Sequence, residues 1–164
     1  MMSGSDWPFL AEMPPDRAEL QRQFVESDPF LRLLGLRFGD ARPDAVTLSV
    51  AYRADLTQPT GILHGGIHSI LIDTAIAQAL LTTIRPGFSV VTVRLDTDYF
   101  SAVRSGRIVG SARVVRKGKR IAHGEAVVTD ERDVIVAQGW GVFAVVDAGD
   151  DAREPQRRRR DRSA

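Results

Sequence analysis

The sequence contains no cysteine among its 164 residues. The chain can therefore form no disulfide, no zinc site built on thiolates and no cysteine nucleophile. Disulfides are rare in reducing compartments, so the absence fits a cytoplasmic protein. The N-terminal residues also lack the basic segment and following apolar segment that direct export. We therefore expect a cytoplasmic location.

Long apolar runs are also missing. No apolar stretch free of polar or helix-breaking residues reaches the ~18 residues that a membrane span requires. With 43% hydrophobic and 26% charged residues, the composition is that of an ordinary globular protein. A chain of 164 residues is long enough for one core but short for two. The sequence predicts a single globular domain with no membrane partner.

The formal net charge of only +1 hides an uneven distribution. Residues 153–164 carry six arginines and two acidic residues, so this segment has a net charge of +4 and the rest of the chain −3. A basic tail can attract nucleic acid, but the rest of the chain lacks the basic stripe with interleaved aromatic residues that a nucleic-acid-binding face needs. We expect a solvated, disordered tail over residues 148–164 and no nucleic-acid partner.

Hydrophobic periodicity places one long helix between extended segments. Residues 1–27 form a lead that ends in a short helix, and a second helix begins after Asp28, a typical N-cap, and ends at Gly35. The longest helix candidate is 61–81. Period-two alternation predicts extended segments at 36–38, 45–52, 88–100, 106–116, 120–130 and 134–146, the last four as a meander. This order predicts an α+β domain over residues 28–147, a curved antiparallel sheet of about six strands wrapped around the helix.

One carboxylate, Asp73, lies in the middle of the long apolar helix candidate. An ionised carboxylate in an apolar place is costly, and burial raises its pKa toward values useful to a general base. Gly65 and Gly66 lie where the chain should turn into the helix, and a helix N-terminus offers unpaired N–H groups to an oxyanion. The sequence therefore holds a carboxylate suited to a general base and a pair of glycines suited to an oxyanion site.

These two components are too far apart to act together within one chain. If the helix begins near Gly65, Asp73 lies about 12 Å further along its axis, at ~1.5 Å per residue. Two such helices running antiparallel across a twofold axis bring Asp73 of one subunit near Gly65 of the other. We therefore expect a homodimer with two equivalent sites, each shared between the subunits.

Two other interpretations of the same run remain open at this stage. Asp73 could be the N-cap of a short helix that follows a buried strand over residues 66–72. His64 and His68 have the i, i+4 spacing of helical metal ligands, but no carboxylate or third ligand accompanies them. We expect no metal and no cofactor.

The residues from Gln58 to Asp73, QPTGILHGGIHSILID, resemble the signature Asn-x-x-Gly-x-x-His-Gly-Gly…Asp of the hotdog-fold acyl-CoA thioesterases of the phenylacetate-pathway (PaaI-like) type. The resemblance extends to VVTVRLDTDYFSAV at 90–103 and to residues 118–143. It covers roughly residues 30–146 and implies a hotdog fold and hydrolysis of a small or medium acyl-CoA, aromatic acyl groups included. It also implies a homodimer that assembles as a tetramer.

The resemblance also implies roles for individual residues. Gly65 matches the glycine whose N–H polarises the thioester carbonyl, and Asp73 matches the catalytic carboxylate, which acts as general base or as nucleophile through a mixed anhydride. Gln58 matches the amide that helps to hold the carbonyl or the water. His64 matches a histidine that shapes the turn by hydrogen bonding. Thr92 falls where some relatives place a hydroxyl that orients water.

Some features depart from the family pattern or leave its details open. Strand alternation places Thr92 on one face with Arg94 and opposite Leu95, so a plain strand threonine is an equal alternative. Ala77 stands where some relatives carry a hydroxyl residue. The acyl pocket is expected at residues such as Ile67, Ile70 and Ala77. The candidate contacts for the phosphates of CoA are Arg94, Arg104, Arg107, Arg113, Lys117, Lys119 and Arg120.

The same scaffold can also serve two other functions. A hydratase or dehydratase of acyl thioesters would need a catalytic histidine opposite an acid in a differently spaced motif, which the sequence does not contain. A noncatalytic acyl-CoA-binding module would tolerate loss of the acid, but this chain keeps Asp73. The sequence therefore favours an acyl-CoA thioesterase.

Overall fold

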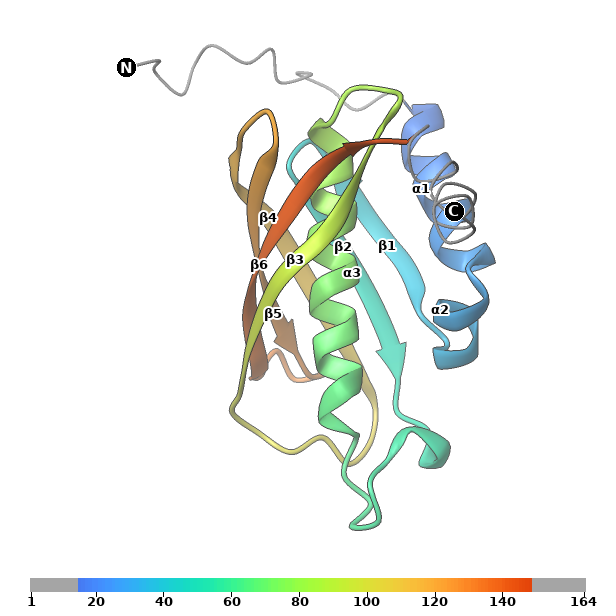
Figure 1. Ribbon diagram of the computed structural model, residues 1–164. Helices are drawn as coiled ribbons and strands as arrows, with labels where there is room; N and C mark the ends of the chain where they lie inside the picture. The colour runs from blue at the N-terminus through green and yellow to red at the C-terminus, as the bar shows by residue number, and fades with distance from the viewer. Residues whose placement is uncertain (1–14, 149–164) are drawn as a thin grey trace, which may run out of the picture.

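The computed structural model describes residues 15–148. Most of the expected tail at 148–164 and the first part of the expected lead at 1–27 therefore lie outside the described residues. Within them, a six-stranded antiparallel sheet curves around one long helix, α3 (Figure 1). This arrangement confirms the α+β hotdog architecture expected from the sequence.

The elements follow in the order α1 (Pro15–Ser27), α2 (Pro29–Leu34), β1 (Arg37–Arg42), β2 (Ala45–Ala51), a short 3₁₀ turn (Ala54–Leu56), α3 (Gly65–Thr83), β3 (Phe88–Tyr99), β4 (Arg107–Lys117), β5 (Ile121–Thr129) and β6 (Ile135–Asp147). The predicted N-cap of α2 at Asp28 and its end at Gly35 are confirmed. Oδ1 of Asp28 accepts the N–H groups of Phe30 and Leu31 at 2.8 and 3.0 Å, and Gly35 ends the helix with a left-handed φ of 75°.

The order of the strands in the sheet differs from the predicted meander. The order is β1-β2-β4-β5-β6-β3, so β3 pairs with β6 and not with its sequence neighbour β4. The segment between β3 and β4 crosses near the start of α3, where the Leu63 N–H donates to the Val103 carbonyl at 2.8 Å. Because this crossing carries the chain past the helix, β3 becomes an edge strand of the sheet.

The helix α3 packs close to the sheet because three strands present glycine to it. A Cβ on Gly110 would lie 2.8 Å from Leu71, one on Gly124 would lie 2.4 Å from Ile76, and one on Gly139 would lie 2.9 Å from Ile72. Real side chains do not approach so closely, so any larger residue would push the helix away. The length and apolarity of α3 would also suit a membrane span, but 56% of that stretch is buried inside the fold, as expected of a core helix.

One side of α3 is not fully covered by its own sheet. Its partly exposed residues recur with helical spacing at Gly65, Gly66, Ser69, Ile70, Asp73, Thr74, Ala77 and Leu81. The edge strand β3 lies along this same side and exposes Val91 and Val93, at 45% and 62% of their surface. The described chain therefore has an incomplete core along α3 and β3.

Candidate active site

The start of α3 is fixed by His64. Its ring Nδ1 accepts the N–H of Gly66 at 3.0 Å, and its backbone carbonyl accepts the N–H of Ile67 at 2.9 Å. His64 is therefore the N-cap and Gly65 the first helical residue. Since α3 runs unbroken from Gly65 to Thr83, the alternative that Asp73 caps a short helix after a strand is wrong. The hydrogen bonds of the cap hold one helix through the whole motif.

Gly65 presents its backbone at the positive end of this helix. The described residues give its N–H no acceptor, as expected for the first residue of a helix. A Cβ at Gly65 would lie 3.4 Å from the ring of Tyr99, which is an ordinary contact. Packing within the chain therefore does not require glycine here. A ligand that approaches the peptide closely would require it.

Asp73 is held by a hydroxyl from the neighbouring strand. The Thr92 hydroxyl on β3 donates to Oδ1 of Asp73 at 2.8 Å. Burial raises the pKa of Asp73 above its ordinary value, and the hydrogen bond from Thr92 partly counteracts this rise. The carboxylate is thus oriented through one oxygen, while Oδ2 accepts no hydrogen bond from the described residues and can accept a proton.

A β-bulge brings Thr92 to this position. The pairing of β3 with β6 shifts between Thr92 and Arg94, so Val93 has no partner in the register. Thr92 and Leu95 both line the groove beside Asp73, whereas Arg94 forms an exposed ion pair with Asp96. The expectation that alternation puts Thr92 on one face with Arg94 and opposite Leu95 is therefore wrong, because the extra residue reverses the alternation at the bulge.

The groove beside Asp73 has a volume of about 580 Å³. Its walls come from α1, α2, α3, β3 and β6, and it is mainly apolar. Ile70 and Ala77 line it as expected, whereas Ile67 does not and is buried in the core. The sequence did not indicate that Phe24 and Phe30, which are 60% and 53% exposed, would also line it. Their exposure and their position near Asp73 are visible only in the fold, so the sequence carried no signal for them.

A second interaction on the same face of α3 was also missed. The hydroxyls of Ser69 and Tyr99 lie 2.5 Å apart, one helical turn before Asp73. His68 is buried next to them, with its ring edge-on to Tyr99, and burial lowers its pKa. His68 is therefore part of the buried core around α3. Among the described residues, no group of three acidic or histidine side chains could hold a metal ion.

Gln58 lies in the loop before α3, and the described contacts do not bring it to Asp73. Its backbone forms a turn, with its N–H donating to Ile62 and its carbonyl accepting from Gly61, both at 2.9 Å. The side chain is exposed. Within one chain, the structure brings together Asp73 and Thr92 at one place and His64 and Gly65 at another, with Gln58 on the side of Gly65.

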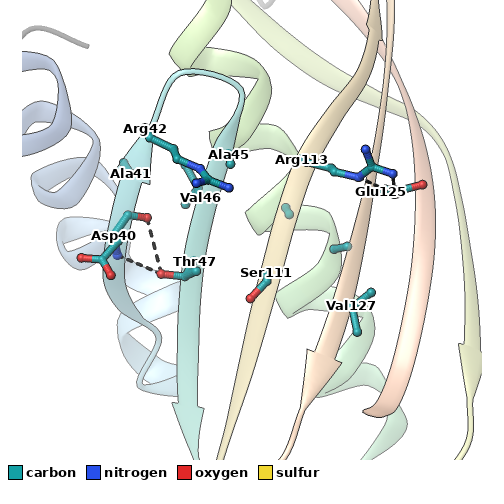
Figure 2. Close-up of a pocket in the computed structure, with 12 residues that line it drawn as sticks. Asp40, Ala41, Arg42, Ala45, Val46, Thr47, Ser111, Arg113, Glu125 and Val127 are labelled. Carbon is teal, nitrogen blue, oxygen red and sulfur yellow. Dashed lines mark hydrogen bonds and ion pairs between the residues drawn. The ribbon is translucent and has the colours of Figure 1, made fainter. Parts of the chain in front are cut away.

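Another groove lies on the outer face of the sheet, away from α3 (Figure 2). The backbone N–H of Asp40 donates to the Thr47 hydroxyl at 2.8 Å, and Arg113 forms an ion pair with Glu125. These polar groups are already paired with one another, and none lies beside Asp73. Arg113, a candidate ligand contact in the sequence, therefore lies on the outer face of the sheet and does not line the groove beside Asp73.

Comparisons with known proteins agree with this geometry. The family model described as "Thioesterase superfamily" matches residues 60–137. A Mycobacterium tuberculosis protein named "Putative esterase" is 32% identical over 114 residues, which cover 68% of this chain and 81% of the relative. Its solved structure has a TM-score of 0.70 at 30% identity, covering 73% of this chain and 98% of that one.

A mammalian enzyme is also similar. Acyl-coenzyme A thioesterase 13 of Mus musculus is 30% identical over 133 residues, covering 79% of this chain and 94% of the mouse protein. The human protein of the same name is 29% identical over the same length. The family model's match over residues 60–137 includes the start of α3, Asp73 and strands β3, β4 and β5.

Proposed function

Because this chain belongs to the thioesterase superfamily and is a thioester hydrolase, we propose that it hydrolyses a small or medium acyl-CoA to the free acid and CoA. The observation that carries the proposal is the partly buried Asp73, oriented by Thr92 in an apolar groove. The mammalian relatives are named as acyl-coenzyme A thioesterases, which supports CoA as the carrier. The aromatic side chains at the groove favour an acyl group with apolar or aromatic surface.

In the proposed reaction Asp73 acts on water. Its Oδ2 removes a proton from a water molecule, whose oxygen forms a bond to the thioester carbonyl carbon. The negative charge that develops on the carbonyl oxygen is stabilised by the N–H of Gly65 at the helix N-terminus. The carbon–sulfur bond then breaks with its electron pair on sulfur, and the proton on Asp73 neutralises the leaving thiolate.

Direct attack by Asp73 is the alternative chemistry. Its carboxylate would form a mixed anhydride, which water then hydrolyses. A single turnover in ¹⁸O-labelled water tests for the anhydride. Hydrolysis of the anhydride at the aspartyl carbonyl puts the label in Asp73, which direct attack by water on the thioester never does.

The proposed site is shared between two subunits. Gly65 and Asp73 are eight residues apart on one straight helix, about 12 Å at ~1.5 Å per residue, which is too far for one carbonyl group. If Asp73 faces Gly65 of a second copy across a twofold axis, Ser69 lies at the midpoint of the pair. Its small side chain would let the two helices approach closely. The uncovered side of α3 and the exposed edge of β3 support this arrangement.

Two further residues have supporting roles in this proposal. His64 holds the first turn of α3 so that the Gly65 N–H points out of the helix. Gln58 lies on the same side as Gly65, so in the dimer its amide would approach the carbonyl or the attacking water of the site that contains the second copy's Asp73. We also propose that the enzyme acts in the cytoplasm.

Mixing two inactive variants tests the shared site. Asp73→Asn and Gly65→Val should each abolish most thiol release from acyl-CoA. If the proposal is correct, co-refolding them in equal amounts restores about one quarter of the wild-type activity, because each mixed dimer holds one intact site. If both groups act within one chain, mixing restores nothing and the proposal fails.

The control for this experiment pairs each variant with a second preparation of itself. Refolding Asp73→Asn with Asp73→Asn should restore no activity, so any gain must come from mixed dimers. Sedimentation of the refolded samples should show dimers or larger assemblies. A strictly monomeric protein with wild-type activity would contradict the proposal.

A further inference from the structure

A second pocket of about 610 Å³ lies at the C-terminal end of α3. Four basic residues from separate parts of the chain line it: Arg17, Arg85, Lys117 and Lys119. No acidic residue is among its lining residues within the part of the chain that the structure describes. Asp147 is the paired residue of Phe88 in the sheet but does not line the pocket. The pocket therefore has a strong excess of positive charge.

Two of these basic residues are held by the end of the helix. Arg17 donates to the carbonyls of Leu81 and Ile84, and Lys117 donates to the carbonyl of Thr83. Burial and the charge of Arg17 lower the pKa of Lys117. Their hydrogen bonds to the carbonyls at the C-terminal end of α3 explain why these two cations lie here. They do not explain why Arg85 and Lys119 lie here.

Arg85 and Lys119 are exposed, and neither has an ion pair with a described carboxylate. Arg85 instead lies over the ring of Phe88, with its guanidinium carbon 4.3 Å from the ring centre. This stacking holds the guanidinium at the pocket and leaves its N–H groups available to a ligand. Two cations thus remain for an anion beside the two that serve the helix.

The basic pocket continues the groove of the active site. Phe88 lines the basic pocket, and Val90, two residues further along β3 and so on the same face, lines the groove. On β6, Val145 lines the basic pocket, and Phe143, two residues earlier and so on the same face, lines the groove. The two hollows are therefore consecutive along one inner face of β3 and β6.

The separation of the two hollows suits a substrate that joins a thioester to a phosphate group. From Asp73 to Thr83 is about 15 Å along the helix at ~1.5 Å per residue. From Thr92 to Phe88 is about 13 Å along the strand at ~3.3 Å per residue. A pantetheine arm is an extended chain between sulfur and pyrophosphate, and it must cross a distance of this order.

We propose that the basic pocket binds the phosphate groups of the thioester's carrier, with Arg85 and Lys119 as the residues that contact them. This inference rests on the proposed thioester hydrolysis at Asp73. Guanidinium and ammonium groups are the usual protein partners of phosphate, and four cations around one pocket suit a ligand with several negative charges. The pantetheine arm lies along β3, and the acyl group extends from Asp73 toward Phe24 and Phe30.

The test compares two substrates with the same acyl group, an acyl-CoA and the acyl thioester of N-acetylcysteamine, which has no phosphate. In the double variant Arg85→Ala/Lys119→Ala, KM for the acyl-CoA should rise about tenfold or more with little change in kcat. For the N-acetylcysteamine thioester, kcat/KM should stay within about twofold of wild type. Adenosine 3′,5′-bisphosphate should inhibit wild type competitively against acyl-CoA and the double variant much more weakly.

The matched control is Arg37→Ala/Arg132→Ala, which removes the same charge from exposed positions at the opposite end of the sheet and should leave both substrates unaffected. Equal losses for both substrates in the test variant, or no loss for either, would overturn the phosphate site. A third substrate, an N-acetylcysteamine thioester whose acyl group ends in a carboxylate, tests whether Arg85 and Lys119 bind the acyl group instead. A loss of activity confined to this substrate would show that they do, and would also overturn the phosphate site. If wild type released no thiol from either substrate, the proposed function itself would fail.

Discussion

The Thr92 hydroxyl on β3 donates a hydrogen bond to Asp73 on α3, and this bond joins the centre of the core helix to the edge strand of the sheet. It exists because a β-bulge turns Thr92 toward the helix. The carboxylate is thereby held beside an apolar groove while burial makes ionisation more difficult.

Removing the hydroxyl should shift the pH dependence of the reaction. Burial raises the pKa of Asp73, and the hydrogen bond from Thr92 lowers it. Since the proposed reaction needs the ionised carboxylate, activity should fall as the pH is lowered through this pKa. Thr92→Val should move this acidic limb of kcat/KM to higher pH, because the bond that stabilises the ionised form is lost. Thr92→Ser should restore the wild-type limb, and a limb that is the same in all three proteins would contradict this role.

Replacing Asp73 should lower the activity and raise the stability of the protein. Asp73→Asn should reduce kcat/KM by about 100-fold or more, the usual contribution of a general base. Because the folded pKa of Asp73 is raised, its ionisation costs stability as the pH rises through the window between the unfolded and folded pKa values. Asp73→Asn should therefore raise the melting temperature at neutral pH, and the difference should disappear at a pH below that window. The exposed Asp98→Asn serves as a control that should change neither property.

A methyl group at Gly65 should impair catalysis without unfolding the protein. The new Cβ would lie 3.4 Å from Tyr99, an ordinary contact, so Gly65→Ala should keep a melting temperature close to that of wild type. The methyl group would hinder approach of the carbonyl to the backbone N–H, so kcat/KM should fall about tenfold or more. Full activity in the alanine variant would show that the substrate does not approach this peptide.

A methyl group at Gly124 should have the opposite effect, with a loss of stability that comes from the core. The new Cβ would lie 2.4 Å from Ile76 and force α3 away from the sheet. Gly124→Ala should cost about 1–3 kcal/mol of the free energy of unfolding, measured by denaturant titration. Adding Ile76→Ala should cost less in this variant than in wild type, because it removes the group that clashes. Strict additivity of the two substitutions would contradict the close packing.

The start of α3 could be predicted because its signal is local. A histidine cap followed by two glycines acts on the first turn of the same helix, and the apolar run that follows can only be satisfied inside a sheet. For the same reason Asp28 and Gly35 correctly marked the ends of α2. Asp73 could be recognised as unusual because its neighbours in the sequence are apolar.

The contacts that complete the candidate site could not be predicted in this way. Thr92 was assigned to the wrong face because a bulge depends on how β3 fits against β6 and α3, not on the residues within β3. Phe24 and Phe30 reach the groove only because α1 and α2 pack beside α3. No periodicity in a single segment contains that information.

The amino-acid sequence by itself therefore determined the core helix, its cap, the period of the strands and the isolated acid, because each depends on neighbours along the chain. The tertiary structure alone decided that β3 lies at the edge beside β6, that Thr92 meets Asp73, and that Arg17, Arg85 and Lys119 gather at one end of the helix. These outcomes depend on which surfaces pack together, and packing joins residues that no local pattern connects.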